Sequence, residues 1–339
     1  MMSSGQSGEA PCSAEVLACV APYTKADPRA SLGQVANSFG LFALGWWLMV
    51  RSLAWSYALT LLLALPTAGM LARIFIIQHD CGHGSFFRSK RWNTALGLVC
   101  SVLTFTPFHR WRQNHAVHHA HVGNLDRRGV GDVPTLTVRE YLGRSRWQRF
   151  WYRAVRHPLV MFLAAPLYLL LIAHRLPERG QLRSVMGTNL ALAILWGLLA
   201  FAIGPRALLL VELPVLMGFA SLAVWMFFVQ HQFEDTYWAN TDDWDYVTAA
   251  LRGSSYYKLP ALLMWFTGNI GLHHIHHLSP RVPNYRLQAC HDASPLFRQV
   301  PVMTLRTSLR TVRLALWDED RRRLISFAAL ETTALERAA

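Results

Sequence analysis

Charged residues are scarce in this sequence. Asp, Glu, Lys and Arg make up 16% of the 339 residues and hydrophobic residues make up 53%, whereas soluble domains average about 25% charged residues. This composition excludes an ordinary soluble domain and predicts an integral membrane protein. Acidic residues are scarcer than basic ones, with 20 Asp and Glu against 33 Lys and Arg. Because basic residues gather at the cytoplasmic face of spanning helices, we assign the excess to the membrane surface and expect no nucleic acid partner.

The sequence also lacks a cysteine pattern. Its cysteines are odd in number, and no two have the CxxC spacing of a metal or redox motif. We therefore expect reduced thiols, as in the cytoplasm, and no disulfide framework. Residues 1–31 are rich in Ser, Gly, Ala and Pro and contain no run that is apolar enough for a signal peptide. We interpret them as a flexible cytoplasmic N-terminal tail.

Four apolar runs approach the length of about 20 residues that a bilayer requires. Residues 32–50 and 53–77 form one expected hairpin, and residues 185–203 and 207–229 form a second one that turns at Gly204-Pro205-Arg206. A further run, 157–173, is short and carries two prolines, so we assign it as an interfacial or re-entrant helix. The sequence thus predicts an all-α integral membrane fold with four transmembrane helices in two hairpins.

The segments outside the hairpins are basic. Residues 88–156 contain many Arg interleaved with Trp, as expected of a cytoplasmic segment that lies against lipid headgroups. Residues 304–316 have the pattern of a basic amphipathic helix, which either lies on the membrane or docks an acidic redox partner. Glu212 is expected at the far interface, within reach of Arg206. We therefore expect a membrane domain at 32–318 with a cytoplasmic helical cap, followed by a C-terminal tail at 319–339.

Histidines are concentrated in three short motifs, HDCGH at 79–83, HAVHH at 115–119 and HHIHH at 273–277. Each motif places histidines three or four residues apart. Residues at these spacings share one face of a helix, so each motif can offer several imidazoles to a metal. Three such clusters predict a metal site. All three must lie on one side of the membrane, which is why an even number of runs is expected to span it.

The number and type of ligands indicate which metal is bound. Structural zinc has four ligands, usually including cysteine, so eight or more imidazoles indicate two metals. Haem with two axial histidines would need them in the middle of spanning helices, whereas these motifs lie at helix ends. Imidazole-rich sites with open positions suit iron that reacts with O2. We therefore expect a two-iron centre at the cytoplasmic ends of the hairpins.

These motifs resemble a known family. HDCGH, HRWRQNHAVHH, VQHQFED and NIGLHHIHHLSPRVPNY are similar to the histidine boxes of the membrane fatty acid desaturases, across residues 32–318. They are most similar to the bacterial and plastid acyl-lipid group that includes delta-12 (omega-6) enzymes. The resemblance implies a non-haem di-iron centre with O2 as co-substrate. It also implies introduction of a cis double bond into a membrane lipid acyl chain, on the cytoplasmic side of a bacterial inner membrane.

The resemblance also assigns roles to residues. It implies nine metal ligands: His79, His83, His115, His118, His119, His231, His273, His276 and His277. Ligand imidazoles need a hydrogen-bond partner on their second ring nitrogen. The candidates for this role are Asp80, Asp126, Asp132, Glu234, Asp235, Asn269 and His274.

The lone His231 has two interpretations. On spacing alone, it caps the end of the last apolar run and bonds to Glu234 or Asp235. With the resemblance, the eight box histidines divide into four per iron, and His231 completes one iron at five. His121 departs from the family pattern, in which we expect a small hydroxyl or apolar residue, so a spare imidazole at this position could contact the site.

The chain carries no redox cofactor motif of its own. It has neither the HPGG haem motif of a fused cytochrome b5 nor a GxGxxG dinucleotide fingerprint. A separate electron donor, ferredoxin-like or similar, is therefore implied. Two alternatives use the same residues. A related di-iron membrane hydroxylase or ketolase would act on alkanes, sterols or carotenoids, and a non-enzymatic membrane metal carrier or sensor would only bind the metal.

Overall fold

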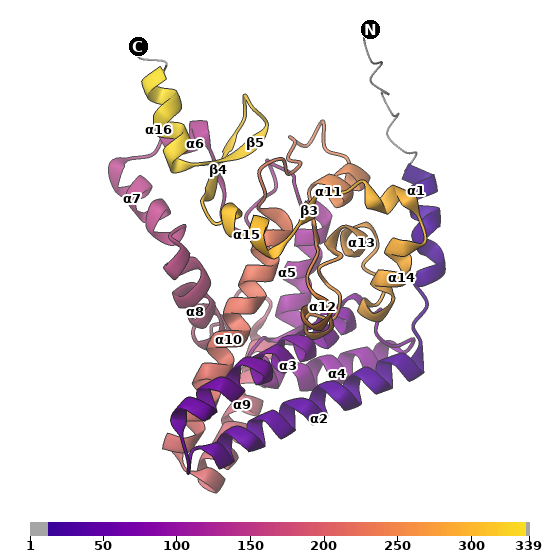
Figure 1. Cartoon of the computed structure of the whole chain (residues 1–339), viewed down its shortest axis with the longest axis vertical. Helices are drawn as coiled ribbons and strands as arrows, with labels where there is room; N and C mark the ends of the chain where they lie inside the picture. Colours follow the sequence, from indigo (N-terminus) through magenta and orange to yellow (C-terminus); the bar gives the residue numbers. More distant parts are fainter. Residues whose placement is uncertain (1–12, 337–339) are drawn as a thin grey trace.

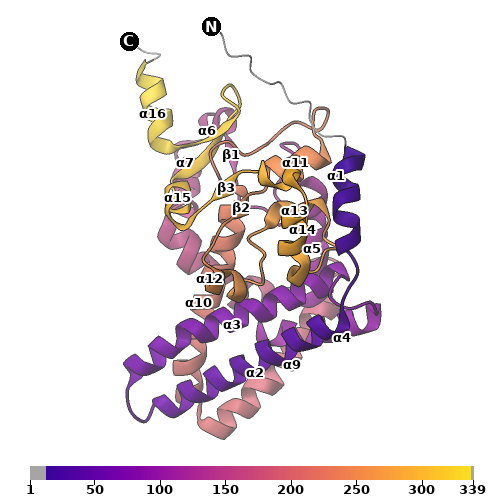
Figure 2. The same ribbon diagram turned by 45° about the vertical axis from the view of Figure 1, so that its right-hand side comes forward.

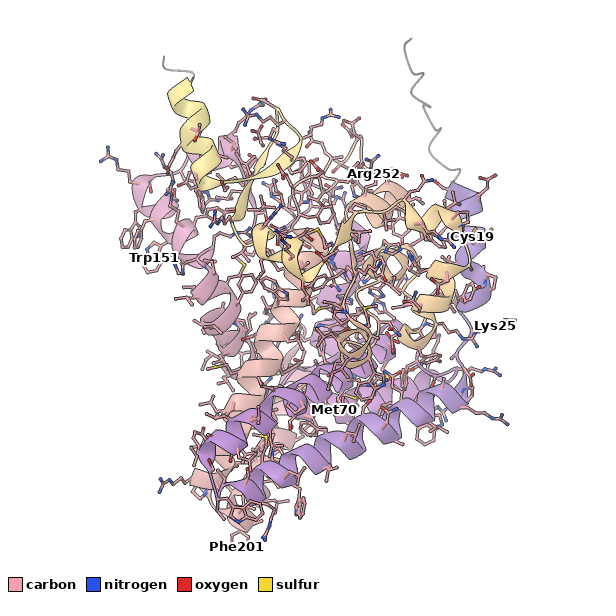
Figure 3. The ribbon with its side chains drawn as sticks, viewed as in Figure 1. Cys19, Lys25, Met70, Trp151, Phe201 and Arg252 are labelled. Atoms are coloured by element: carbon pink, nitrogen blue, oxygen red, sulfur yellow. The ribbon has the colours of Figure 1, made fainter. Side chains whose placement is uncertain are left out.

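Two long helical hairpins form the lower half of the molecule in Figure 1. The computed structural model describes residues 13–336. The first hairpin joins α2 (Pro28–Ser52) to α3 (Tyr57–His83), and the second joins α9 (Leu182–Ile203) to α10 (Pro205–His231). Phe201, labelled in Figure 3, lies near the closed end of the second hairpin. From these closed ends, α3 and α10 both run toward the upper half of the molecule.

α3 and α10 pack directly against each other. Gly218 lets the two helices approach closely, because a Cβ at this position would lie 2.9 Å from the Cβ of Ala68. The side chains buried along this contact are apolar. They include Leu71, Ile74 and Ile77 of α3 and Val211, Val215 and Phe219 of α10. The packing fixes the relative positions of the two helix ends that carry His79, His83 and His231.

Three helices of the described chain are long and apolar enough to cross a membrane, namely α3, α9 and α10. The fourth expected span, residues 32–50, falls in α2 and is not among them. The buried residues of α2 include the polar Gln34, Ser38 and Ser52 beside the apolar Phe42 and Met49. Another candidate is the pair formed by residues 146–155 and 160–175, which is bent by 58°. The protein therefore has three or four apolar spans, and the expected count of four stays a prediction.

Shorter helices make up the rest of the molecule, and most of them lie beyond the ends of α3 and α10, whereas α4 and α8 lie beside the hairpins (Figures 1 and 2). The helices on the amino-terminal side of α9 are α1 (Ser13–Val20), α4 (Lys90–Leu103), α5 (Phe108–His121), α6 (Val138–Leu142), α7 (Arg146–Val155) and α8 (Ala165–Leu171). Those that follow α10 are α11 (Tyr246–Arg252), α12 (Ala261–Phe266), α13 (His273–Leu278), α14 (Leu287–Asp292), α15 (Leu305–Thr311) and α16 (Phe327–Glu336).

Five short strands correct the all-α expectation. β1 (Leu136–Thr137) pairs in parallel with β4 (Leu314–Asp318), which pairs antiparallel with β5 (Arg323–Ser326). β2 (Tyr256–Tyr257) pairs in parallel with β3 (Val302–Met303). The helix expected at 304–316 ends at Thr311, because the residues that follow it are held by two partner strands. Helical periodicity in one segment carries no information about such partners.

Both predicted tails are partly ordered. α1 buries Val16 and Val20 in the core of the upper half, and Asp27 caps α2 by accepting a hydrogen bond from the Arg29 amide at 2.9 Å. Residues 13–31 therefore belong to the folded chain, residues 1–12 lie outside the described chain, and the domain bounds expected at 31 and 319 stay a prediction. β5 and α16 occupy most of the expected C-terminal tail, where Glu331 accepts a hydrogen bond from Arg153 at 2.8 Å. Residues 337–339 lie outside the described chain.

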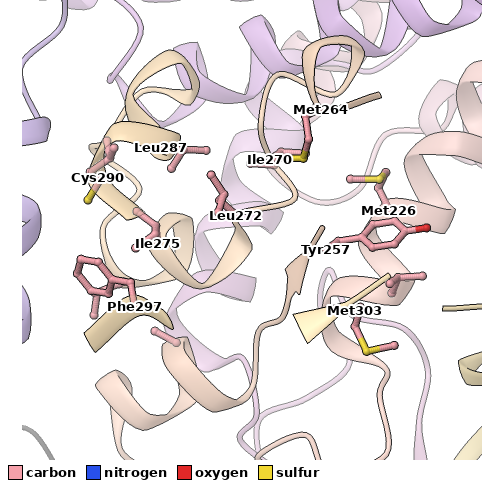
Figure 4. Packing of buried hydrophobic residues seen from close by; sticks show 14 of the residues in the cluster. Met226, Tyr257, Met264, Ile270, Leu272, Ile275, Leu287, Cys290, Phe297 and Met303 are labelled. Atoms are coloured by element: carbon pink, nitrogen blue, oxygen red, sulfur yellow. The ribbon is translucent and has the colours of Figure 1, made fainter. Parts of the chain in front are cut away.

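An apolar cluster holds the third histidine motif in place. Leu272 and Ile275 are fully buried, and Figure 4 shows them between Cys290 and Tyr257. The Tyr257 hydroxyl accepts a hydrogen bond from Trp225 Nε1 of α10 at 3.1 Å and lies 3.0 Å from Ser308 Oγ of α15. Because the Tyr257 amide also donates to the Gly271 carbonyl at 2.7 Å, Tyr257 connects the segment before α13 to α10 and α15.

Candidate metal centre

The first histidine motif occupies the last turn of α3. His79 and His83 lie four residues apart on one face, and the helix ends at Gly84, which has a φ of 71°. The residue just before His83 is Gly82, and its lack of a side chain leaves room for the Trp111 ring, which packs against it. A Cβ at Gly82 would lie 2.8 Å from an atom of that ring. Trp111 was expected at the headgroups, but its ring stacks on His115, with centroids 4.5 Å apart and planes inclined by 21°.

The second and third motifs lie on separate short helices. α5 carries His115, His118 and His119 in its last two turns. α13 begins at His273 and ends at Leu278, and all six of its residues are buried. Ser279 follows as the C-cap, as expected from the Ser-Pro sequence that ends this motif.

The structure brings all nine predicted ligands together in two groups. One group contains His79, His83, His115, His119 and His276, and the other contains His118, His231, His273 and His277. Within each group, the chosen ring nitrogens all lie within 4.8 Å of one another. We call these the five-histidine group and the four-histidine group. Each group could hold one metal ion.

Helical geometry explains how the motifs divide. In both HxxHH motifs the first and last histidines, four residues apart, belong to one group, and the histidine three residues after the first belongs to the other. Around a helix, i+4 lies about 40° from i in one direction and i+3 about 60° from i in the other, so i+3 and i+4 are about 100° apart. α5 and α13 therefore each contribute to both groups.

This division corrects one expectation. The box histidines were expected to divide equally, with His231 completing a group of five. Instead, five box histidines form one group without His231, and His231 completes the group of four. His118 and His276, the histidines at i+3, account for the difference, because each is turned about 100° around its helix from the histidine at i+4 and faces the other group.

The spacing of the ring nitrogens fits metal ligation. The Nε2 atom of His276 lies 3.0 Å from that of His79 and 2.9 Å from that of His119. In the other group, His273 Nε2 lies 2.9 Å from His231 Nε2 and 3.1 Å from His277 Nε2. Two nitrogens bound at right angles to one ion, each at about 2.1 Å, lie about 3.0 Å apart.

Three of the rings also have a defined proton position. His231 Nδ1 donates to the Gly253 carbonyl at 3.0 Å, and His79 and His118 Nδ1 donate to Asp80 at 3.0 Å and Asp132 at 2.6 Å. In the neutral rings, Nε2 then carries a lone pair that faces other nitrogens. Among the described residues, the buried His83 and His118 Nε2 atoms have no hydrogen-bond partner. A cation at each group would satisfy these lone pairs.

Burial keeps the imidazoles neutral. Desolvation, and then the neighbouring histidines, lower the pKa of the ligands on α5 and α13 well below the ordinary value of 6.5. The residues affected are His115, His119, His273, His276 and His277. A neutral imidazole is the form that ligates a metal, so the electrostatics agree with the geometry.

Only some of the predicted hydrogen-bond partners contact the ligands. Asp80 and Asp132 do, as described above. Asp126 instead accepts from the Thr241 amide at 2.8 Å, and Glu234 pairs with Arg323 at 3.1 Å. In the described chain, no hydrogen bond joins a ligand histidine to Asp126, Glu234, Asp235 or Asn269 side chains, so the capping interpretation of His231 through Glu234 or Asp235 is wrong.

Three other predicted residues lie away from the ligand atoms. His274 is fully buried, and its Nε2 lies 3.1 Å from His291 Nδ1, outside both groups. His121 belongs to neither group, and its Nδ1 lies 3.0 Å from the Val117 carbonyl. Glu212 was expected at the interface near Arg206, but it is buried and accepts a hydrogen bond from Trp46 Nε1 at 3.1 Å.

Sequence reasoning missed residues whose contacts are long-range. The Gly253 carbonyl is a backbone group without a side-chain signal. Asn284 donates to Asp80 from a position 204 residues later in the chain. Trp111 alone had a local signal, because its spacing of four residues from His115 on one helix predicts contact between the two rings.

Comparison with known proteins agrees with this geometry. The profile of the family described as fatty acid desaturase matches residues 52–304. A fatty acid desaturase of Bacillus subtilis (strain 168) is 45% identical over 316 residues, which cover 92% of this chain and 90% of that protein.

Two cyanobacterial proteins are more distant relatives. An sn-1 oleoyl-lipid 12-desaturase of Synechocystis sp. is 26% identical over 277 residues, covering 78% of this chain and 73% of that protein. An sn-1 acyl-lipid omega-3 desaturase (ferredoxin) of the same organism is 28% identical over 237 residues, covering 65% and 63%. With its apolar helices and its histidine groups, the chain therefore belongs to the fatty acid desaturase family and is a membrane-bound oxidoreductase.

Proposed function

We propose that this protein is an O2-dependent acyl-lipid desaturase that binds two non-haem irons, one in each histidine group. The observation that carries the proposal is the convergence of nine histidines from α3, α5, α10 and α13 into two groups with nitrogen spacings suited to a metal. The reaction converts CH2–CH2 of an acyl chain into CH=CH. O2 accepts the two hydrogens together with two electrons and two protons, and two water molecules are formed.

The bound irons would supply the activation of O2 that removal of hydrogen from an unactivated methylene demands. The chain's own residues hold the ligands and keep the site dry. Seven of the nine histidines are buried. A neutral imidazole presents a lone pair without a proton to be displaced. Asp80, Asp132 and the Gly253 carbonyl fix the orientation of one ring each.

We further propose that the site lies on the cytoplasmic side of a bacterial inner membrane, with α2 as the fourth span. The outward face of α2 is apolar, with exposed Leu41, Leu44, Trp47 and Leu48, as expected of a surface in contact with lipid. Cysteines introduced at Arg144 and Arg179 should then react with reagent only from the cytoplasmic side, and one at Arg206 only from the other side. Labelling of the Arg179 position from outside would contradict this topology.

Electrons would come from a separate donor of the ferredoxin type. One cyanobacterial relative has ferredoxin in its name, and the net charge of +13 favours an acidic partner. The oleoyl-lipid relative makes a membrane lipid the favoured substrate and the 12 position the favoured site.

Expression in a host without polyunsaturated lipids tests the proposed reaction. New acyl chains should be lighter by two hydrogens, and a product heavier by one oxygen would instead indicate a hydroxylase.

Purified protein should contain about two irons per chain. A His276→Gln variant produced at the same level should form no product, because His276 Nε2 lies between those of His79 and His119. Active protein with zinc and no iron would contradict the proposal.

A further inference from the structure

We propose that Asn284 is a positioning residue for the metal ligand His79, acting through Asp80. This inference rests on the proposed di-iron function. Asp80 Oδ1 accepts the hydrogen bond of His79 Nδ1 at 3.0 Å. The other carboxylate oxygen, Oδ2, accepts two hydrogen bonds from Asn284, one from its backbone amide at 2.7 Å and one from its side-chain Nδ2 at 2.8 Å.

The two bonds from Asn284 determine how Asp80 faces the ring. A carboxylate that is held at one oxygen by two donors cannot rotate freely, so its second oxygen stays aligned with His79 Nδ1. This alignment keeps the ring proton on Nδ1, so Nε2 carries the lone pair. His79 Nε2 lies 3.0 Å from His276 Nε2, and the two atoms face each other.

The charge of Asp80 makes these bonds necessary. Asp80 is 2% exposed and Asn284 is 1% exposed, so water cannot replace a lost donor. In the described chain, no Lys or Arg pairs with Asp80, and the His79 ring is the partner of its Oδ1 atom. A buried carboxylate without a cationic side chain depends on hydrogen-bond donors and on the charge of a metal relayed through the imidazole.

The surrounding chain holds Asn284 in this position. Pro280 and Pro283 stiffen the loop that leads from the third histidine motif to Asn284. The next residue, Tyr285, accepts a hydrogen bond at its hydroxyl from the Asp27 amide at 2.9 Å. Ser31 Oγ donates to the Phe86 carbonyl at 2.6 Å, directly after the first motif. The N-terminal segment therefore contacts Tyr285, beside Asn284, and the loop after the first motif.

The chain offers a matched control at Asn93. Asn93 is 3% exposed and also makes two hydrogen bonds with the loop after the first motif. Its Oδ1 accepts from the Phe87 amide at 2.9 Å, and its Nδ2 donates to the Phe87 carbonyl at 2.8 Å. Loss of either asparagine removes a buried amide from the same region, but only Asn284 contacts Asp80.

The experiment compares Asn284→Asp and Asn93→Asp in the full-length protein in nanodiscs. Both changes keep the side-chain size and remove the Nδ2 donor. Iron affinity is measured by competition with a chelator, the two irons are resolved by ⁵⁷Fe Mössbauer spectroscopy, and thermal unfolding is followed in parallel. We expect Asn284→Asp to weaken one of the two irons by about 10- to 100-fold and to change its Mössbauer doublet alone. Asn93→Asp should leave both doublets unchanged.

A double-mutant cycle tests whether the effect passes through Asp80. With Asp80→Ala already present, Asn284→Ala should cause no further loss of iron affinity. Wild-type iron affinity and spectrum in Asn284→Asp would overturn the inference while leaving the di-iron proposal intact. Equal losses in the Asn284 and Asn93 variants would show a merely structural role and also overturn it. Wild-type protein that binds no iron would contradict both proposals.

Discussion

The two histidine groups share α5 and α13, but α3 contributes only to the five-histidine group and α10 only to the four-histidine group, and their surroundings differ. The five-histidine group contains His83 and His115, which are only half-buried, and the ring of Trp111 covers one of them. All members of the four-histidine group are buried, and His118 and His277 are each 1% exposed. The five-histidine group therefore has one ligand more and an edge that solvent can approach.

The rings of the two groups are also held differently. Asp80, which orients His79, is 2% exposed and receives two further hydrogen bonds. Asp132, which orients His118, is 17% exposed and belongs to a glycine-rich loop, in which Gly129 and Gly131 have positive φ angles. We infer that the four-histidine group depends on burial and on every one of its ligands, whereas the five-histidine group depends on the fixed Asp80.

His231→Gln should have the largest effect, because it leaves the four-histidine group with three ligands. Gln can still donate to the Gly253 carbonyl but offers no imidazole. We expect desaturation to fall by more than about 100-fold and one iron per chain to be lost. His121→Gln is the control, since His121 belongs to neither group, and it should keep both irons. Full iron content and normal turnover in His231→Gln would remove His231 from the ligand set.

His83→Gln should have a smaller effect, because four histidines remain in its group. We expect a decrease in activity of about 10- to 100-fold, with partial iron occupancy of one site. Product yield and iron content are measured side by side with those of His231→Gln. If the two variants lose activity and iron equally, the fifth histidine does not compensate for the loss of His83.

The sequence predicts what depends on local periodicity. The spacing within each motif identifies eight of the nine histidines that gather in the two groups, because imidazoles three or four residues apart on a helix lie close together. The family resemblance adds His231, which spacing alone assigns to a cap. The same periodicity turns His118 and His276 about 100° around α5 and α13 from the histidines that follow them. Which group each of them joins depends on how α3, α5, α10 and α13 pack, and no single motif contains that information.

What the sequence does not reveal depends on contacts between distant segments. The residues of β4 have the pattern of the end of an amphipathic helix, and only the pairing with β1 and β5 makes them a strand. The N-terminal residues 13–31 have a composition typical of a tail, but the side chains of Val16 and Val20 are buried in the core of the upper half. Asn284 follows a pair of prolines in what reads as an ordinary loop, and only the fold brings it to Asp80. Tertiary contact outweighs local composition in all three cases.

The carboxylates allow a finer comparison of the two groups. Asp80→Asn removes the charge that faces His79 and places an amide against the two donors of Asn284. We expect one iron to bind about 10- to 100-fold more weakly, whereas Asp132→Asn should weaken the other iron by about tenfold, since water can reach position 132. Mössbauer spectra distinguish the two sites. A larger loss for Asp132→Asn would mean that burial of the carboxylate is not what matters.

The smallest effect should come from the aromatic residues that cover the two groups. Trp111 stacks on His115 of the five-histidine group, and the Phe227 ring lies 5.0 Å from that of His118 in the four-histidine group. Trp111→Leu should open the half-buried edge and let a chelator remove one iron about threefold faster, because apolar cover controls access of solvent to a metal. Phe227→Leu should change the rate less, since every ligand of its group is buried. Chelation kinetics in nanodiscs measure both rates. Faster loss from Phe227→Leu than from Trp111→Leu would show that the four-histidine group, despite its burial, is the one that solvent enters.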